Sequence, residues 1–461
     1  MPMLNWIWLA FLLIAVVVGG FTGRLDALTK GAFETAKDAV IGLALPLAGL
    51  MAVWLGMMRL AERGGLVQII ARVLRPVLRR LFPDVPPEHP AMGAMVMNMA
   101  ANMLGLGNAA TPLGLRAMLL LQQLNPRKDT ASNAMVTFLA INTASIQLLP
   151  TTAISYLILA GAHDATGFVP AAVLATTLGL TCGILMAKIL ERLPMFAPGP
   201  PEPESRSDVT AQPNEEAPPL EESTLAPLTP VKRLVVWAHL AIFALIFLVI
   251  YAPAAMEWIP RLLHEPWHYG DLFPDMSLAE KPVLRGLRTL SLIAVPWLLT
   301  FLPLYAALRG VKVYEQFTDG AKEAFATATR IIPFLVAILV SIRMLREAGI
   351  IQALTEKLGP LLARVGFPAE ILPMVLLRPL SGSATLGMFV ELINRPGIGP
   401  DSLIAKMAAT IFGSTETTFY VLTVYFGSVA IRKTRHAILA GLTADTVAVI
   451  ASVTLCRLFF A

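Results

Sequence analysis

A short polar run in the last quarter of the chain carries the strongest chemical signal. Residues 412–420 read FGSTETTFY, so Glu416 stands among four hydroxyl side chains between two apolar stretches. An ionisable group at bilayer depth is energetically costly and usually faces a cavity, an opposite charge or a ligand. Close packing of membrane helices through serine and threonine is the plainer alternative. We interpret Glu416 as a functional group, and Arg378 as a second charge surrounded by apolar sequence.

Polar residues of this kind gather in four segments. The first half holds two of them, within Pro90–Leu124 and Ser132–Ile154, and the second half holds Arg378–Thr385 and Ser414–Thr418. Asparagine and glycine at this density interrupt membrane helices, and the freed backbone groups need protein or water around them. Broken or re-entrant helices are therefore expected, with ends that present partial charges to a polar solute. The predicted solute-binding residues are Asn102, Asn108, Thr111, Asn142, Thr143, Ser145, Arg378, Ser381, Ser383, Ser414, Thr415, Glu416 and Thr417.

Two roles are open for the charged residues among them. Arg378 and Glu416 could pair with each other, which would lower the cost of burying both. Alternatively, Glu416 binds a proton or a cation and Arg378 binds an anionic solute. The sequence does not choose between these roles.

Composition indicates an all-α polytopic membrane protein. The 461 residues are 56% hydrophobic and only 15% charged, whereas soluble proteins average about 25% charged residues. The net charge of +5 suits a surface that faces anionic lipid better than nucleic acid, because no basic stripe interleaves with aromatic residues. Cys182 and Cys456 lie in apolar runs and are interpreted as small hydrophobic residues.

The motifs of enzymes are missing from the sequence. It contains no Gly-x-Ser-x-Gly elbow between a strand and a helix, no His-Glu-x-x-His and no phosphate loop. His264 and His268 are one helical turn apart, but Pro266 lies between them and no third ligand is evident. We therefore expect neither an enzyme nor a bound metal or cofactor.

Changes in composition divide the chain into four parts. Residues 1–195 form a first membrane domain, and residues 196–230, rich in proline, glutamate and serine, read as a disordered linker. Residues 231–319 hold extra transmembrane helices with a surface segment, and residues 320–461 form a second membrane domain. In the first domain, the run Arg59–Arg80 alternates arginines with apolar residues at helical spacing, which predicts an interfacial helix.

The second membrane domain repeats the first. RLAERGGLVQIIARVLRP at 59–76 matches RMLREAGIIQALTEKLGP at 343–360 in one register without gaps, from Arg59 on Arg343 to Pro76 on Pro360. Further on, Phe138 falls on Phe412 and Asn142 on Glu416, in a second shared register. Duplicated membrane units with broken helices are typical of transporters that bind their solute between the repeats.

Several long motifs resemble a known family. NMLGLGNAATPLGLRAM (102–118) and FLAINTASIQLLPTT (138–152) resemble spore maturation protein A. RPLSGSATLG (378–387), GSTETTFYVLTVYFGSV (413–429) and GLTAD (441–445) resemble spore maturation protein B, so the chain looks like a fusion of the two.

The resemblance implies a Gate, or nucleoside-recognition, domain in each half, as in concentrative nucleoside transporters and the membrane part of ferrous iron transport protein B. It also implies a multi-pass protein of the bacterial inner membrane with transporter-like architecture, and in spore formers a link to dehydration of the spore core.

We therefore predict a permease for a small polar solute with its site between the repeats. The alternative is a membrane scaffold or signalling component that does not transport. A coupling ion and self-association are left open. The arginine-rich run 59–80 and the basic residues at 432–435 favour the cytoplasmic side by the positive-inside rule. Inverted repeats would instead put the two interfacial helices on opposite faces, so the sequence leaves the orientation undecided.

Overall fold

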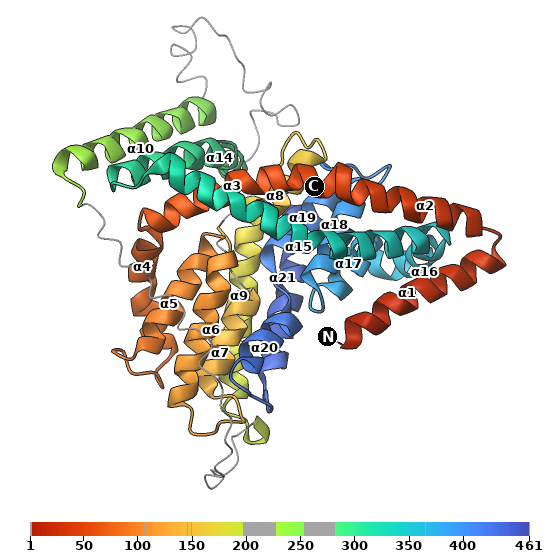
Figure 1. The fold of residues 1–461 in the computed structure, drawn as a ribbon, viewed down its shortest axis with the longest axis horizontal. Helices are drawn as coiled ribbons and strands as arrows, with labels where there is room; N and C mark the ends of the chain where they lie inside the picture. The colour runs from red at the N-terminus through yellow and green to blue at the C-terminus, as the bar shows by residue number, and fades with distance from the viewer. Residues whose placement is uncertain are drawn as a thin grey trace, which may run out of the picture. The chain divides into compact units, whose positions relative to one another are not determined.

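Figure 1 shows the computed structural model, which describes residues 2–105, 107–144, 146–148, 150–196, 227–252, 282–364 and 366–460. Most of the predicted linker (197–226) and the surface segment with His264 and His268 (253–281) lie outside these residues.

Helices make up nearly all of the described chain, and the only β-pairing found there is an isolated bridge between Thr130 and Lys433. The first half contains α1 (Pro2–Phe21), α2 (Leu25–Asp38), the π-helical turn η1 (Ala39–Ala44), α3 (Leu45–Arg63), α4 (Leu66–Leu81), α5 (Pro90–Met103), α6 (Gly107–Leu124), α7 (Asn133–Ala144), α8 (Thr151–Leu159), α9 (Val169–Leu190) and the 3-10 turn η2 (Pro194–Phe196). After it come α10 (Pro230–Tyr251), α14 (Pro282–Leu308), α15 (Val313–Glu347), α16 (Ile350–Arg364), the 3-10 turn η3 (Ala369–Ile371), α17 (Leu372–Leu377), α18 (Gly382–Ile393), α19 (Leu403–Ser414), α20 (Thr418–Gly427) and α21 (Ala437–Phe460).

Four described helices are long and apolar enough to cross a membrane. They are Leu25–Arg63, which joins α2 to α3, and α9, α10 and α21. The apolar stretches at 39–58 and 234–251 lie inside Leu25–Arg63 and α10, and the stretch at 168–190 matches α9 to within one residue. Two further apolar stretches, near the start of the chain and at 289–308, form parts of α1 and α14.

The chain folds into two compact units. The first contains residues 1–54, 67–221 and 321–461, and the second contains residues 55–66 and 222–320. Nearly all of both repeats therefore lies in the first unit, while most of the predicted middle part (231–319) belongs to the second unit.

Matching turns mark the duplication. The amphipathic helices α4 and α16 begin at Leu66 and Ile350, which are paired in the register that the sequence predicts. Each begins after a glycine with positive φ, Gly65 at 86° and Gly349 at 80°, a conformation that glycine adopts without steric cost. The run Arg59–Arg80, predicted as one interfacial helix, is therefore divided between two helices. Arg59 and Arg63 lie at the end of α3, and the residues after Gly65 form α4.

The second part of the repeat has a different register from the predicted one. Helix α7 ends at Ala144 and α19 ends at Ser414, whereas the predicted register places Ala144 on Thr418, one helical turn further along. Glu416 therefore lies in the break that follows α19, whereas Asn142 lies in the last turn of α7. The sequence match paired similar residue types that are one helical turn apart in the two repeats.

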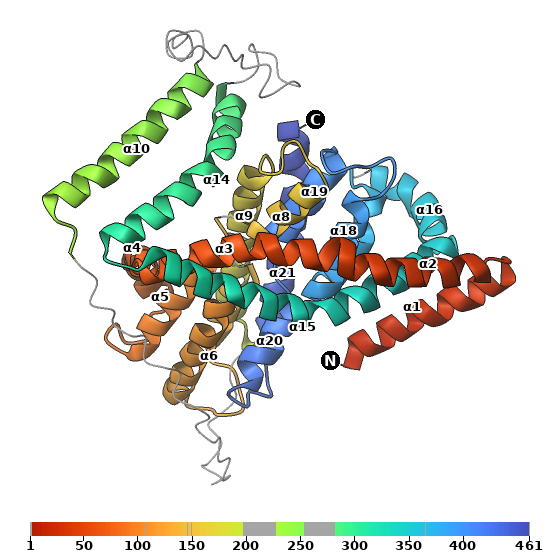
Figure 2. The same ribbon diagram turned by 45° about the horizontal axis from the view of Figure 1, so that its top comes forward.

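Helices α9 and α21 form the central pair of the first unit, side by side in Figures 1 and 2. A Cβ atom on Gly179 would lie 2.9 Å from the Cβ of Ala448, and one on Gly183 would lie 2.8 Å from the Cβ of Ala444. Small residues let two membrane helices approach this closely. Because α7 and α19 pack against this pair, the close contact positions the broken helices of both repeats.

This packing predicts that Gly183→Leu destabilises the protein. The new side chain meets Ala444, and overpacking of this kind costs about 1–3 kcal/mol. Thermal unfolding of the detergent-purified protein should therefore occur at a lower temperature. Gly20→Leu is the control, because Gly20 also lies in an apolar helix and a Cβ on it meets nothing within 4 Å. Equal melting temperatures for the two variants would contradict the close α9–α21 contact.

Candidate functional site

The breaks of the two repeats touch each other inside the first unit. The first break separates α7, which ends at Ala144, from α8, which begins at Thr151. The second separates α19, which ends at Ser414, from α20, which begins at Thr418. The backbone N–H of Glu416 donates to the carbonyl oxygen of Thr143 over 3.0 Å. Backbone groups freed by one break are thus partly satisfied by the other, as burial in a membrane requires.

Arg378 covers the C-terminal end of α19. Its side chain is only 4% exposed and follows the last residue of α17. The guanidinium donates from Nε to Thr415 Oγ1 over 2.8 Å, and from Nη2 to the carbonyl oxygens of Phe412 (3.0 Å) and Thr415. It also lies over the Phe412 ring, 4.8 Å from its centre. Because the last carbonyls of a helix are unpaired and carry partial negative charge, Arg378 stabilises the end of this broken helix.

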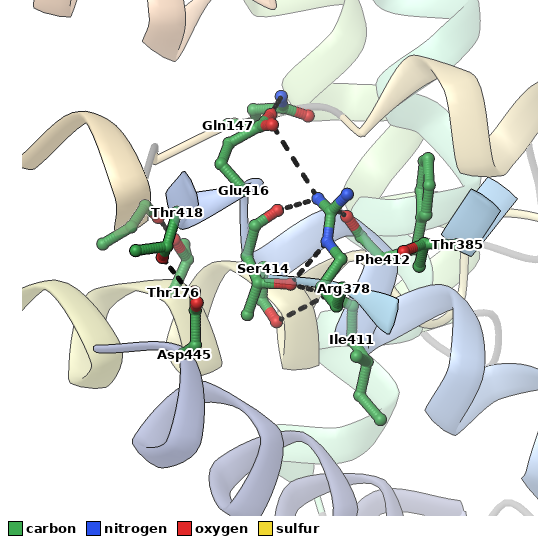
Figure 3. Close-up of polar contacts among 12 residues, drawn as sticks. Gln147, Thr176, Arg378, Thr385, Ile411, Phe412, Ser414, Glu416, Thr418 and Asp445 are labelled. Carbon is green, nitrogen blue, oxygen red and sulfur yellow. Dashed lines mark hydrogen bonds and ion pairs between the residues drawn. The ribbon is translucent and has the colours of Figure 1, made fainter. Parts of the chain in front are cut away.

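Glu416 lies between Arg378 and a glutamine of the first repeat (Figure 3). Its Oε2 is 3.9 Å from Nη2 of Arg378, and its Oε1 accepts a hydrogen bond from Gln147 Nε2 over 3.3 Å. The pairing that the sequence allowed is therefore present, at the outer limit of an ion pair. The Glu416 side chain remains 35% exposed, so the carboxylate can also contact a solute.

A cavity of about 250 Å³ opens beside these charges. Both repeats line it, through Gln147, Pro150, Thr152, Ala153, Arg378, Gly382, Ser383, Leu386, Phe412 and Glu416. One part of the wall offers an amide, hydroxyls and charges, and another part offers aliphatic and aromatic surface. Ligand sites commonly combine an apolar lining with a few placed polar groups.

The predicted asparagines form a separate network. Asn142 Oδ1 accepts from Asn102 Nδ2 over 3.0 Å and from Tyr425 Oη over 3.2 Å, while its Nδ2 donates to the Phe138 carbonyl over 2.9 Å. Asn98 extends the network, donating to the Ala110 carbonyl over 2.7 Å and to Tyr425 Oη over 3.4 Å. Asn142 and Asn102 do not line the cavity. Together with those of Asn98, their hydrogen bonds connect α5, α6 and α7 of the first repeat to α20 of the second.

The serine and threonine residues that were predicted to bind the solute have different surroundings. Ser383 lines the cavity, and Ser381 beside it caps α18 by accepting from the Ala384 N–H. Ser414 contacts Ser452 of α21 over 3.1 Å, and Thr415 accepts from Arg378.

The side chains of three of the five remaining predicted residues belong to the described part of the chain. Thr143 is buried and its hydroxyl donates to the Ala140 carbonyl. Thr417 is also buried, and Thr111 is half-buried on α6. Ser145 and the side chain of Asn108 lie outside the described residues.

A second acid near this centre, Asp445, is buried and was not among the predicted site residues. It lies on α21 with 5% of its surface exposed, and its Oδ2 accepts from Thr418 Oγ1 at the start of α20 over 2.6 Å (Figure 3). Its other oxygen, Oδ1, has no hydrogen-bond partner among the described residues. A lone carboxylate in a membrane-length apolar run could have identified Asp445, by the same reasoning that identified Glu416.

Gln147 lies within the polar segment Ser132–Ile154 of the first repeat, but it was not among the predicted binding residues. Its contact with Glu416 depends on how the two breaks meet, which the local pattern does not reveal. Within the described ranges, no group of three or more histidine, cysteine, aspartate or glutamate residues could hold a metal ion.

Comparisons with known proteins agree with the duplicated architecture. The Gate family, described as "Nucleoside recognition", matches residues 44–162 and 328–432. Spore maturation protein A of Bacillus subtilis (strain 168) is 42% identical over 174 residues, which are 38% of this chain and 88% of that protein. Spore maturation protein B of the same organism is 43% identical over 171 residues, which are 37% of this chain and 95% of that protein.

Among solved structures, the YdaH transporter of Alcanivorax borkumensis matches with a TM-score of 0.46 and 16% identity, over 99% of this chain and 97% of that one. The two curated relatives are matched over most of their own lengths, each by little more than a third of this chain. The chain therefore belongs to the family of spore maturation proteins A and B, as a single polypeptide consistent with a fusion of the two.

Proposed function

We propose that this membrane protein is a permease for a small polar solute, which binds in the cavity beside Arg378 and Glu416. The observation that carries the proposal is that polar groups of both repeats line one cavity where two broken helices meet. Transporters with duplicated units bind their solutes at such a junction, because half-helix ends and unwound backbone supply partial charges there. Movement of one repeat against the other would then change the side from which the cavity is reached.

The lining favours a solute with both a polar edge and an apolar face. Arg378 lines the cavity, and the Glu416 side chain is partly exposed. Thr152 and Ser383 add hydroxyls, while Leu386 and Phe412 supply an apolar wall. A nucleoside has this combination of hydroxyls, ring amides and a ring face. The description of the Gate family supports nucleosides as the first probes.

Charge balance supports a coupling cation. Arg378 is the one cation among the described side chains of this centre, whereas Glu416 and Asp445 are two acids close enough to act on it. Each break brings one negative and one positive helix end, so the helix ends cancel and the side chains leave one excess negative charge. A proton or a monovalent cation at Asp445 would neutralise it, since Asp445 Oδ1 has no hydrogen-bond partner among the described residues. We assign the coupling-ion role to Asp445 and the solute contact to Glu416.

The plasma membrane of a bacterium is the proposed location. The apolar helices and the curated relatives from Bacillus subtilis support it. Self-association stays a prediction.

Glu416→Gln tests the solute site. The protein is reconstituted in proteoliposomes, and uptake of radiolabelled uridine, adenosine, glutamate and succinate is measured. We expect at least one probe to enter, and Glu416→Gln to lower its uptake at least tenfold, because the amide cannot keep the charge that faces Arg378 and the solute. The thermal stability should fall only modestly, since the pair with the buried Arg378 is long at 3.9 Å and the Glu416 side chain is partly exposed.

Glu356→Gln is the matched control, because Glu356 is an exposed carboxylate on α16 that contacts Gln352 and does not line the cavity. Its uptake should equal that of the unmodified protein. Uptake of none of the probes, or undiminished uptake by Glu416→Gln, would contradict the proposed function.

Asp445→Asn tests the coupling ion separately. Asparagine keeps an oxygen that can accept from Thr418 but removes the ionisable group, so uptake should no longer respond to an imposed proton or sodium gradient. Exchange of labelled solute without a gradient should persist. A variant that still accumulates solute in response to the same gradient as the unmodified protein would exclude Asp445 as the ion site.

A further inference from the structure

A second cavity lies where a loop of the first repeat meets a loop of the second. It has a volume of about 250 Å³, and it is lined by Asp84, Val85, Leu121, Leu124, Asn125, Pro126, Arg127, Thr130, Ala131, Ser132, Asn133, Ala134 and Arg435. Two of these residues are arginines that come from different repeats. Arg127 belongs to the connection between α6 and α7, and Arg435 to the connection between α20 and α21.

The two loops are fastened to each other. The Ala131 N–H donates to the Lys433 carbonyl over 3.0 Å, and the Lys433 ammonium pairs with Asp129 over 2.9 Å. Arg435 adds hydrogen bonds from Nη1 to the Ala131 carbonyl (3.0 Å) and to Asn133 Oδ1 (2.7 Å). The cavity therefore has a built frame, and Arg435 is held at a fixed position in it.

Guanidinium donors remain unused inside this frame. Nε and Nη1 of Arg127 and Nη2 of Arg435 are buried, and none has a hydrogen-bond partner among the described residues. Buried polar groups are almost always hydrogen-bonded, so each unpaired one needs an explanation. Both arginines that carry these three donors line the cavity, so an acceptor with negative charge at this place would pair them.

The local charges lead to the same conclusion. Burial and the nearby charge of Arg127 both lower the pKa of Arg435, and they outweigh the opposite effect of Glu191, so the two cations repel each other. The neighbouring pairs Lys433–Asp129 and Lys188–Glu191 are internally balanced. Asp84, on the cavity wall, makes no ion pair with the described residues, and it offsets only one of the two arginines.

The backbone of Arg435 is also unusual. Its φ is +53°, a left-handed conformation that residues other than glycine seldom adopt. Such conformations persist where the surrounding structure holds them, and they gather at ligand sites. Here the conformation accompanies a side chain that binds the first repeat and leaves one of its nitrogens free.

We propose that this cavity is a binding site for a phosphate group, held between Arg127 and Arg435. The planar guanidinium presents parallel N–H donors that match phosphate oxygens, and such charge-assisted bonds are short and strong. A bound phosphate would join the two repeats at their loop ends. The basic residues of both loops favour the cytoplasmic face by the positive-inside rule, where free phosphate compounds and anionic lipid headgroups are both available.

The test compares anions on the full-length protein. Delipidated protein in detergent is melted in potassium phosphate and in potassium chloride at equal ionic strength and pH 7. A ligand that binds only the native state raises the melting temperature, and we expect phosphate to raise it by about 2 °C or more. A second arm compares nanodiscs of phosphatidylglycerol with nanodiscs of phosphatidylcholine, without free phosphate.

Arg127→Gln should abolish the anion-dependent rise and should itself melt no lower than the unmodified protein, because it removes a repulsive charge. Arg127→Lys keeps the charge without the paired donors and should bind phosphate at least fivefold more weakly. Arg432→Gln is the matched control, since Arg432 is an exposed arginine of the same loop as Arg435 and does not line the cavity. It should retain the full rise.

A rise in detergent identifies a soluble phosphate ligand, and a rise in phosphatidylglycerol alone identifies a lipid headgroup; either result supports the site. The proposal is overturned if neither anion raises the melting temperature, or if Arg127→Gln and Arg127→Lys both keep the full effect. Melting does not depend on solute uptake, so failure here is distinct from failure of the permease.

Discussion

Unpaired backbone groups in an apolar medium are the constraint on which the rest of the first unit depends. Two helices break in the middle of apolar sequence, and each break frees carbonyls and amides that lipid cannot satisfy. The protein covers them with side chains and with the opposite repeat: Arg378 binds the carbonyls at the end of α19, and the Glu416 N–H binds Thr143 of α7. Duplication therefore has a physical use, since the second copy supplies a partner for backbone groups that the first copy frees.

The charged residues of the candidate site follow from this arrangement of helix ends. A cation is needed at the carbonyl end of α19, and a buried cation in turn requires an acid nearby, which Glu416 provides at 3.9 Å. The long ion-pair distance and the partial exposure of Glu416 leave the pair incompletely satisfied on the cavity side. In the proposed function, polar groups of the bound solute would complete this pair.

Much of the membrane architecture could be predicted from sequence, because apolar length and helical periodicity are local properties. The first register correctly related α4 to α16, including the glycine before each helix. The second register, which paired Phe138 with Phe412, is wrong by one helical turn at α7 and α19. It aligned similar residue types, but the ends of the two helices do not correspond in it. Arg378 and Glu416 could be identified from charge in apolar surroundings. Gln147 could not be identified as their neighbour, nor Asn142 as part of a separate network, because both facts depend on how the two breaks cross.

The two repeats are joined by different chemistry at different places. Between the central helices, Gly179 and Gly183 allow close contact with alanines of α21, and apolar packing of this kind is insensitive to ligands. At the loops, by contrast, Arg435 binds Ala131 and Asn133, while two buried nitrogens of Arg127 have no partner among the described residues. Opposite charge brought between those arginines would strengthen a connection that repulsion now weakens. Residues of both repeats line the proposed solute cavity and also the cavity at the loops. A ligand at either place would therefore act on the same set of contacts between the repeats, which includes the Asn142–Tyr425 bond and the α9–α21 pair.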